Sequence, residues 1–334
     1  MNKYKKALIK FLLSWNNSEW KSQNKIKILV QTNSYFSKDL WLRSFKSKYK
    51  YYSNSEFIFP KNKISLIKLI KYADACFLWS LSNFINLEET KLKLIYFGTV
   101  GTEFLENKTI PDQIKVFNAK GISSEAIAEY VLTMALILNR DLHLSFIAKK
   151  KRKWIQNDLL KNPYIPLKYK KIGILGYGTN GKAIAALLKS LGCYVNVMDV
   201  KYIKDECVDS FYLNTELESF LKKSDIIVIT PSLNKTTTYL INEAFLEKLK
   251  ENSILINVSR GKVIRDNDLK KIITSKKIKY VVLDVFEKEP LSFFDWKWKN
   301  SKVIVTPHIA GNINYFVNNV MNDFIDKLNQ ELNL

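Results

Sequence analysis

Histidine, cysteine, glycine and proline are scarce in this chain, and each scarcity excludes a class of protein. The two histidines, His143 and His308, and the three widely spaced cysteines show no metal-ligand or Cys-x-x-Cys spacing, so no metal site is predicted. Ten glycines and seven prolines exclude collagen-like and low-complexity chains. No apolar run reaches the roughly 18 residues of a membrane span. Because unpaired cysteines are typical of a reducing compartment, we expect a cytoplasmic protein.

Arginine is also scarce, although the chain is strongly basic. Only five of the 53 basic residues are Arg, and the formal net charge is +21, of which residues 1–50 and 149–171 together carry +18. Reading of base edges favours the planar, bidentate guanidinium, so no specific nucleic-acid partner is predicted. The lysines indicate a solvated surface, with an anionic surface or partner as the alternative. Lys10 interrupts the apolar part of MNKYKKALIKFLLSW, which therefore predicts a basic amphipathic helix and not a secretory signal.

The order of apolar segments predicts an α/β fold. At 334 residues the chain has room for two domains. Strands are expected at residues 25–32, 75–79, 92–97, 171–176, 194–199, 225–230, 253–258 and 280–285, with helices between them. Such alternation is typical of a parallel sheet covered by helices on both faces. Residues 123–140 predict a long connecting helix, and residues 314–332 a final helix that packs back on the first domain.

A glycine-rich motif follows one predicted strand and opens a helix. Its residues are Gly176, Tyr177, Gly178, Thr179, Asn180 and Gly181. In such a turn the first glycine permits a tight bend, the second lets backbone amides approach a pyrophosphate, and the third lets helix and strand pack closely. The motif predicts dinucleotide binding at residues 176 and 178–181, with an ordinary glycine-rich turn as the alternative.

Asp199 ends the next predicted strand and bears on the choice of cofactor. A carboxylate at this place accepts hydrogen bonds from a ribose diol and repels a 2′-phosphate. NAD is therefore predicted in preference to NADP, although the nearby Lys201 weakens that preference.

Three further segments, each after a predicted strand, carry candidate catalytic residues. They are NVSRGK with Arg260, LDVFEKEP with Asp284 and Glu289, and VTPHIAG with His308. Loops after parallel strands line the ligand crevice of an open sheet, so these side chains are expected to converge. These three side chains suit hydride transfer to a 2-oxo acid. The guanidinium can hold a carboxylate, the imidazole can move a proton, and the carboxylate can orient the imidazole. For His143, at the end of the connecting helix, a structural role is expected.

Seven motifs in order resemble the D-isomer-specific 2-hydroxyacid dehydrogenase family. They are GTVGTEFL from Gly98, AKGISSEAIAEYVLTMALILNR from Ala119, GYGTNG with Asp199, SDIIVITPSLNKTT from Ser224, INVSRGKVI from Ile256, LDVFEKEP from Leu283 and TPHIAG from Thr306. The resemblance implies two Rossmann-like, doubly wound parallel-sheet domains with the active site in a cleft between them. Residues 1–122 with 310–334 would form the substrate domain, and residues 123–309 the NAD-binding domain.

The resemblance also implies roles for single residues. Arg260 would bind the substrate carboxylate and carbonyl, His308 would be the acid or base, and Glu289 would pair with His308. Asp284 would face the nicotinamide carboxamide, and Thr230 and Pro231 would line the adenosine pocket. Backbone amides near Ser80 and at Val100 and Gly101 would help to hold the substrate carboxylate. Members of the family are usually dimers through the NAD domain.

An alternative without turnover remains open from the sequence. The fold of this family also serves in transcriptional corepressors that sense NAD(H), and the basic segments suit such a binding protein. The presence of Arg260, Glu289 and His308 together favours the dehydrogenase.

Overall fold

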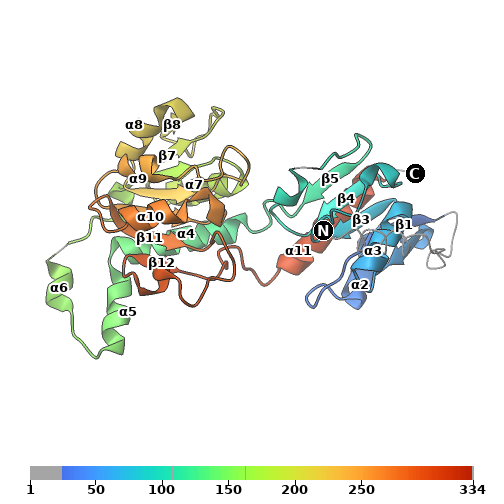
Figure 1. The fold of residues 1–334 in the computed structure, drawn as a ribbon, viewed down its shortest axis with the longest axis horizontal. Coiled ribbons are helices and arrows are strands. Elements are labelled where there is room, and N and C mark those ends of the chain that lie inside the picture. The colour runs from blue at the N-terminus through green and yellow to red at the C-terminus, as the bar shows by residue number, and fades with distance from the viewer. Residues whose placement is uncertain (1–24, 107, 162, 333–334) are drawn as a thin grey trace. The chain divides into compact units, whose positions relative to one another are not determined.

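The computed structural model describes residues 25–106, 108–161 and 163–332 and divides them into two compact units (Figure 1). Unit 1 comprises the described residues up to Ile122 and from Asn314 onward, and unit 2 comprises Ser123–Ile313. The observed return to unit 1 comes slightly later than the predicted one at Ala310. The reason is that Ala310 is buried in the core of unit 2, where its amide donates to Asp284. The helix predicted from MNKYKKALIKFLLSW lies outside the described residues.

Unit 1 is built on a five-stranded parallel sheet of order β2-β1-β3-β4-β5. The strands are β1 (Ile26–Val30), β2 (Ser55–Ile58), β3 (Ala75–Leu78), β4 (Leu94–Phe97) and β5 (Lys115–Asn118). The main helices are α2 (Lys38–Lys48), α3 (Lys63–Leu69) and α11 (Phe316–Glu331). Residues of α2 and α11 share one apolar core with the sheet, and residues of α3 share the other. Figure 1 shows α11, in red, beside these strands although it comes at the end of the chain.

Unit 2 is built on a seven-stranded parallel sheet of order β12-β11-β10-β9-β6-β7-β8. The strands are β6 (Lys171–Leu175), β7 (Tyr194–Met198), β8 (Ser210–Tyr212), β9 (Ile226–Ile229), β10 (Ser253–Asn257), β11 (Ile278–Leu283) and β12 (Val303–Val305). The chain leaves β6 toward β7 and β8 and then returns to β9 on the other side of β6. This reversal makes the carboxyl end of β6 the switch point at which such sheets bind ligands.

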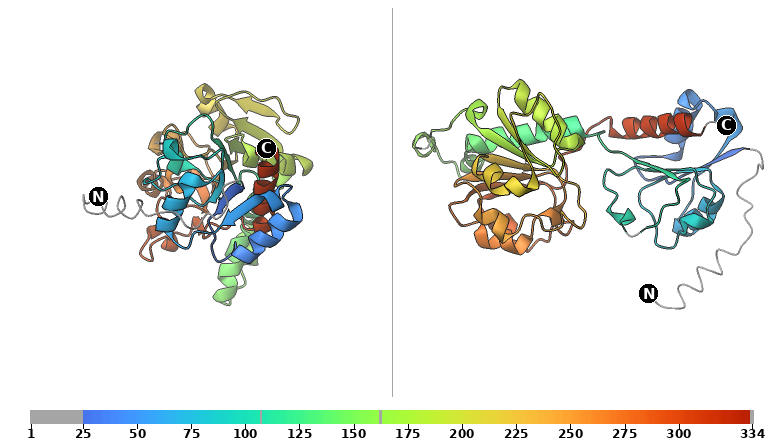
Figure 2. Two further views of the ribbon diagram at one scale, coloured as in Figure 1. Left: turned by 90° about the vertical axis from the view of Figure 1, so that its right-hand side faces the viewer. Right: turned by 90° about the horizontal axis from the view of Figure 1, so that it is seen from above.

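Helices cover both faces of the unit 2 sheet. The helices of unit 2 are α4 (Ser124–Asn139), α5 (Leu142–Lys150), α6 (Gln156–Leu160), α7 (Thr179–Ser190), α8 (Leu217–Lys222), α9 (Glu243–Glu247) and α10 (Asp266–Ile272). Residues of α4 and α7 share one apolar core with the strands, and residues of α8, α9 and α10 share the opposite one. The helices α5 and α6 instead extend away from the rest of unit 2 (Figure 2). Among the described residues no single helix is long and apolar enough to cross a membrane; α4 and α5 reach that length only together, with a bend of 72° between them.

The predicted fold class is confirmed, since both units are parallel sheets covered by helices on both faces. The connecting helix and the final helix are also found, as α4 and α11. Three short strands, β2, β5 and β8, were not predicted, and β12 was expected only as the strand before VTPHIAG, without bounds. All three lie at an edge of their sheet, where only one neighbouring strand pairs with them and a continuous apolar run is not required.

Candidate active site

The loops that carry Arg260, Glu289 and His308 lie at one edge of the unit 2 sheet. They follow β10, β11 and β12, which are parallel neighbours in the sheet. Because the carboxyl ends of parallel strands share an edge, the fold places these three loops side by side.

Glu289 and His308 form a direct contact within this group of loops. Glu289 Oε2 lies 2.8 Å from His308 Nδ1, and Glu289 Oε1 accepts a hydrogen bond from the backbone N–H of Phe286 at 2.9 Å. The carboxylate is thereby fixed to its own loop and fixes the imidazole in turn. A carboxylate can only accept, so Nδ1 is the donor and Nε2 is left to exchange a proton with a substrate.

The backbone of His308 is held in an unusual conformation by a buried carboxylate. His308 has a left-handed φ of 56°, which costs a residue with a Cβ about 1–2 kcal/mol. Asp284, which is 1% exposed, accepts from the N–H groups of Ile309 and Ala310, both at 2.9 Å. Asp284 therefore anchors the turn that presents His308. Its predicted contact with the nicotinamide carboxamide stays a prediction.

Two residues outside the predicted set complete this anchor. The Thr306 hydroxyl donates to Asp284 Oδ1 at 2.6 Å, and the Tyr130 hydroxyl lies 2.6 Å from Thr306 Oγ1. Since the single hydroxyl proton of Thr306 goes to Asp284, Tyr130 must donate to Thr306. Burial raises the pKa of Tyr130 to about 12, so its phenol keeps the proton that it donates. Both residues lie inside quoted motifs, Thr306 in TPHIAG and Tyr130 in the motif from Ala119 that forms α4, but neither was singled out.

The Arg260 loop is held by Asn257 and by a close backbone contact. The buried Asn257 side chain donates to Arg260 O at 3.2 Å and accepts from Ser259 N at 3.0 Å. A Cβ on Gly261 would lie 1.8 Å from the carbonyl carbon of Phe286, so only glycine lets this loop approach the Glu289 loop. The guanidinium directs one N–H to Ser259 O at 2.7 Å. Sequence reasoning did not identify Asn257 or Gly261.

The glycine-rich turn lies at the switch point after β6 and leads into α7. Gly176 has a φ of 93°, and a Cβ there would lie 2.8 Å from Pro231 N. A Cβ on Gly181 would lie 2.3 Å from Gly176 O, which shows how closely α7 packs on the turn. Around Gly178 no atom would lie within 4 Å of a Cβ, so the approach to the first amides of α7 is open. A backbone approach of this kind fits a dinucleotide pyrophosphate.

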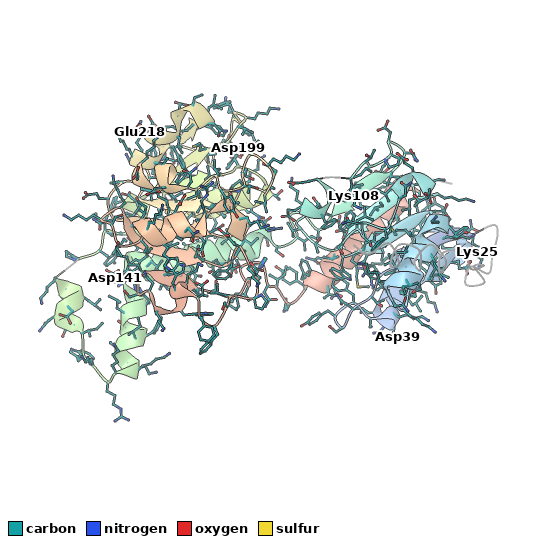
Figure 3. All side chains as sticks on the ribbon, viewed as in Figure 1. Lys25, Asp39, Lys108, Asp141, Asp199 and Glu218 are labelled. Carbon is teal, nitrogen blue, oxygen red and sulfur yellow. The ribbon has the colours of Figure 1, made fainter. Side chains whose placement is uncertain are left out.

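The predicted ribose ligand Asp199 lies beside this turn, after the last residue of β7 (Figure 3). Its Oδ2 accepts from Tyr177 N at 2.5 Å and its Oδ1 accepts from Val200 N at 2.7 Å. Each carboxylate oxygen has further lone-pair capacity for a ribose hydroxyl. Asp199 thus holds the glycine-rich turn against β7 and remains only partly buried.

Three other predicted cofactor residues also hold this turn in place. The Thr230 hydroxyl donates to Gly176 O at 2.7 Å, and Pro231 forms the backbone wall against Gly176. Asn180 Oδ1 accepts from the Ser124 hydroxyl at 2.7 Å, which joins the start of α7 to the start of α4. This bond ties Asn180 to a buried residue.

The predicted substrate-carboxylate residues Ser80, Val100 and Gly101 belong to unit 1. All three follow strands of its sheet, Ser80 after β3 and the other two after β4. Val100 O accepts from Asn118 Nδ2 at 2.6 Å, and Gly101 O accepts from the Thr99 hydroxyl at 2.9 Å. The carbonyls of Val100 and Gly101 are thus engaged, while within the described ranges the N–H groups of all three residues donate to no backbone carbonyl.

Comparison with known proteins agrees with the motifs. Residues 132–310 match the sequence model of the D-isomer specific 2-hydroxyacid dehydrogenase, NAD binding domain. A glyoxylate reductase of Thermofilum pendens is 33% identical over 264 residues, which cover 75% of this chain and 76% of that protein. The chain belongs to the D-isomer specific 2-hydroxyacid dehydrogenase family.

Solved structures of this dehydrogenase family share its fold. A family member from Xanthobacter autotrophicus, in complex with NADPH and MES, has a TM-score of 0.78 at 23% identity, over 91% of this chain and 94% of the other. One from Aeromonas salmonicida has a TM-score of 0.74 at 25% identity, over 91% and 94% of the two chains. A glyoxylate reductase of Pyrococcus horikoshii is 31% identical over 73% of this chain and 75% of its own length.

The second histidine of this dehydrogenase lies away from these loops. His143, in α5, is buried with its ring edge to face with Tyr280, the centroids 4.6 Å apart, and neither ring nitrogen has a hydrogen-bond partner among the described residues. Burial lowers its pKa, the Asp141 carboxylate opposes that shift, and the Lys279 ammonium adds to it. His143 is therefore a packing residue. In the part of the chain that the structure describes, no group of three or more His, Cys, Asp or Glu could hold a metal.

Proposed function

We propose that this family member interconverts a 2-oxo acid and a D-2-hydroxy acid, with His308 as the acid or base and Arg260 as the ligand of the substrate carboxylate. The observation that carries the proposal is the 2.8 Å contact between Glu289 and His308 on a turn anchored by Asp284. A held imidazole with a free Nε2 is what proton transfer to a carbonyl oxygen needs.

His308, Glu289 and Arg260 have different roles in this reaction. In the reducing direction, protonated His308 donates from Nε2 to the carbonyl oxygen, and in the oxidising direction the neutral ring accepts the hydroxyl proton. Glu289 stabilises the charged ring and fixes its orientation. Arg260 holds the carboxylate of the substrate. In unit 1, the amides of Ser80, Val100 and Gly101 stay the expected donors to a carboxylate.

The open approach to the amides at the start of α7 supports NAD as the cofactor, with its pyrophosphate there and its ribose at Asp199. When bound, the nicotinamide supplies or accepts the hydride. We favour NAD over NADP because the Asp199 carboxylate would repel a 2′-phosphate.

The test is the oxidation of NADH by the purified protein with glyoxylate and a panel of larger 2-oxo acids. We expect turnover with at least one acid, and His308→Gln is expected to lower kcat by a factor of about 10²–10⁴ with little change in NADH affinity. Wild-type turnover in His308→Gln would contradict the acid and base assignment. Tight NADH binding without turnover on any acid would favour the cofactor-sensing alternative.

We also propose a homodimer through unit 2, in the cytoplasm. The arm formed by α5, α6 and the turn between them (residues 142–160) exposes large apolar side chains. Among them, Phe146 is 57%, Trp154 89% and Leu160 68% exposed. A surface of this kind is typical of an association site.

The same arm carries the exposed lysine-rich run Lys149–Lys153. We propose in addition that residues 149–171 interact weakly with an anionic surface.

A further inference from the structure

Unit 1 contains a pocket whose lining combines one expected substrate residue, Ser80, with ten residues that have no assigned role. Its volume is about 420 Å³, within the range of small-molecule sites. It opens where β1, β2 and β3 end, and the chain reverses its direction across the sheet between β1 and β3. In parallel α/β sheets such a switch point is where ligands bind. The pocket is lined by Gln31, Thr32, Pro60, Lys61, Asn62, Lys63, Leu66, Ser80, Leu81, Ser82 and Asn83.

The lining of this pocket is positively charged and rich in hydrogen-bond donors. It includes Lys61 and Lys63 and not one Asp or Glu. Among the described residues neither lysine forms an ion pair, so both charges are available to a ligand. A third ammonium stands close by, because Lys108 Nζ donates to Ser82 O at 3.1 Å.

Gln31 adds an oriented donor to the lysines. Its Oε1 accepts from Trp79 N at 3.0 Å, and Trp79 Nε1 donates back to Gln31 O at 3.2 Å. The carbonyl end of the side chain is thus held against the end of β3, and the amide NH₂ remains as a donor. Thr32 and Ser80 add hydroxyl groups to the wall. Donors without acidic neighbours favour a ligand that carries negative charge.

We propose that this pocket binds a second anionic group of the substrate, a carboxylate or a phosphate at the end remote from the 2-oxo group. The inference rests on the proposed function, because Ser80 lines the pocket and is also expected to hold the reacting carboxylate. A dicarboxylic or phosphorylated 2-oxo acid would place its first carboxylate at Ser80 and its remote anion at Lys61 and Lys63. The substrate class is therefore a 2-oxo acid with two anionic ends.

The test compares pairs of acids that differ only at the remote end. One pair is 2-oxoglutarate and 2-oxopentanoate, and the other is phosphohydroxypyruvate and hydroxypyruvate. We expect the wild-type protein to favour the charged member of at least one pair in kcat/KM by about tenfold or more at low salt, with the preference falling as salt rises. The pair that shows the preference identifies the remote group as a carboxylate or a phosphate.

The variant that tests the pocket is Lys61→Gln/Lys63→Gln, and its control is Lys46→Gln/Lys93→Gln, which removes two exposed lysines of unit 1 outside the lining. The first variant is expected to lower the ratio of kcat/KM between the charged and the uncharged acid about tenfold, because KM for the charged acid rises. The control is expected to leave this ratio unchanged. The proposal would be overturned if the wild-type protein had the same kcat/KM for both acids of each pair. It would also be overturned if Lys61→Gln/Lys63→Gln lowered kcat/KM equally for both acids.

Two readouts separate failure of the pocket from failure of the proposed function. Glyoxylate has no remote group, so its reduction and the loss of that reduction in His308→Gln test the function alone. Calorimetric titration of succinate in the presence of NAD tests the pocket without turnover. Binding that weakens in Lys61→Gln/Lys63→Gln supports the pocket even if no acid is reduced, and the same affinity in both proteins counts against it.

Discussion

The buried carboxylate of Asp284 binds both ends of the turn that carries His308. Its Oδ1 accepts from the Thr306 hydroxyl at 2.6 Å on one side of the histidine, and its Oδ2 accepts from Ala310 N at 2.9 Å on the other. A group with this many buried bonds stabilises the fold and positions the imidazole of His308 at the same time.

Asp284→Asn is expected to reduce both stability and activity. The substitution sets an NH₂ donor against a backbone or hydroxyl donor in a buried place, which costs about 1–3 kcal/mol of unfolding free energy. Because the turn then no longer fixes His308, kcat is expected to fall by about 100-fold. Urea unfolding and steady-state kinetics measure the two effects. Thr306→Val is the comparison variant, because it removes the hydroxyl bonds to Asp284 and from Tyr130 but leaves the two backbone bonds of Asp284 in place. An Asp284→Asn protein with unchanged kcat would refute the positioning role.

Asp199→Ala is expected to weaken NADH binding and to narrow the preference for NADH over NADPH. The variant loses a ribose acceptor and also the bond from Tyr177 N that holds the glycine-rich turn. Loss of a charged hydrogen-bond partner raises the dissociation constant of NADH by about 10-fold to 100-fold. Fluorescence titration with both cofactors measures the change, and the dissociation constant of a substrate analogue serves as the control. An unchanged ratio between the cofactors would show that Asp199 does not discriminate.

Replacement of His143 by Phe is expected to remove part of the loss of stability in acid. Because burial lowers the pKa of His143 in the folded protein, the unfolded chain binds a proton that the folded chain does not. The free energy of unfolding therefore decreases as the pH falls from the pKa of the histidine in the unfolded chain, about 6.5, through its lower pKa in the folded protein. Phe keeps the edge-to-face contact with Tyr280 and has no such proton. Melting curves between about pH 7 and 5 should show a smaller decline for His143→Phe than for the wild-type protein. His308→Gln, which retains His143, is the control, and parallel declines in all three proteins would rule out this titration.

Phe146→Glu is expected to dissociate the proposed dimer. Phe146 is 57% exposed in the arm, and a charge placed in an apolar contact raises the dissociation constant by about 10-fold or more. Sedimentation velocity over a range of protein concentrations measures the shift from dimer to monomer. Tyr35→Glu, at a 76% exposed position in unit 1, is the control. A monomeric wild-type protein, or a dimer unaffected by Phe146→Glu, would contradict an interface at the arm.

The local patterns of the sequence determined the fold class and most of the candidate site. Gly176, Gly178 and Gly181 identify the dinucleotide turn because only glycine permits the bend and the close approaches that such a turn needs. Arg260, Glu289 and His308 each follow an apolar strand, and parallel strands bring the ends of such segments to one edge. These properties follow from short-range steric and periodic rules, so they can be recognised without coordinates.

Only the tertiary structure decided which side chains touch. The bonds from Tyr130 through Thr306 to Asp284 join residues far apart in the chain, and no local pattern selects such partners. The edge strands β2, β5 and β8 depend on pairing with a distant neighbour. The pocket that contains Lys61 and Lys63 exists because three strand ends meet at a reversal of the sheet. Contacts of this kind form only when all helices and strands pack together. No short segment of the sequence determines them by itself.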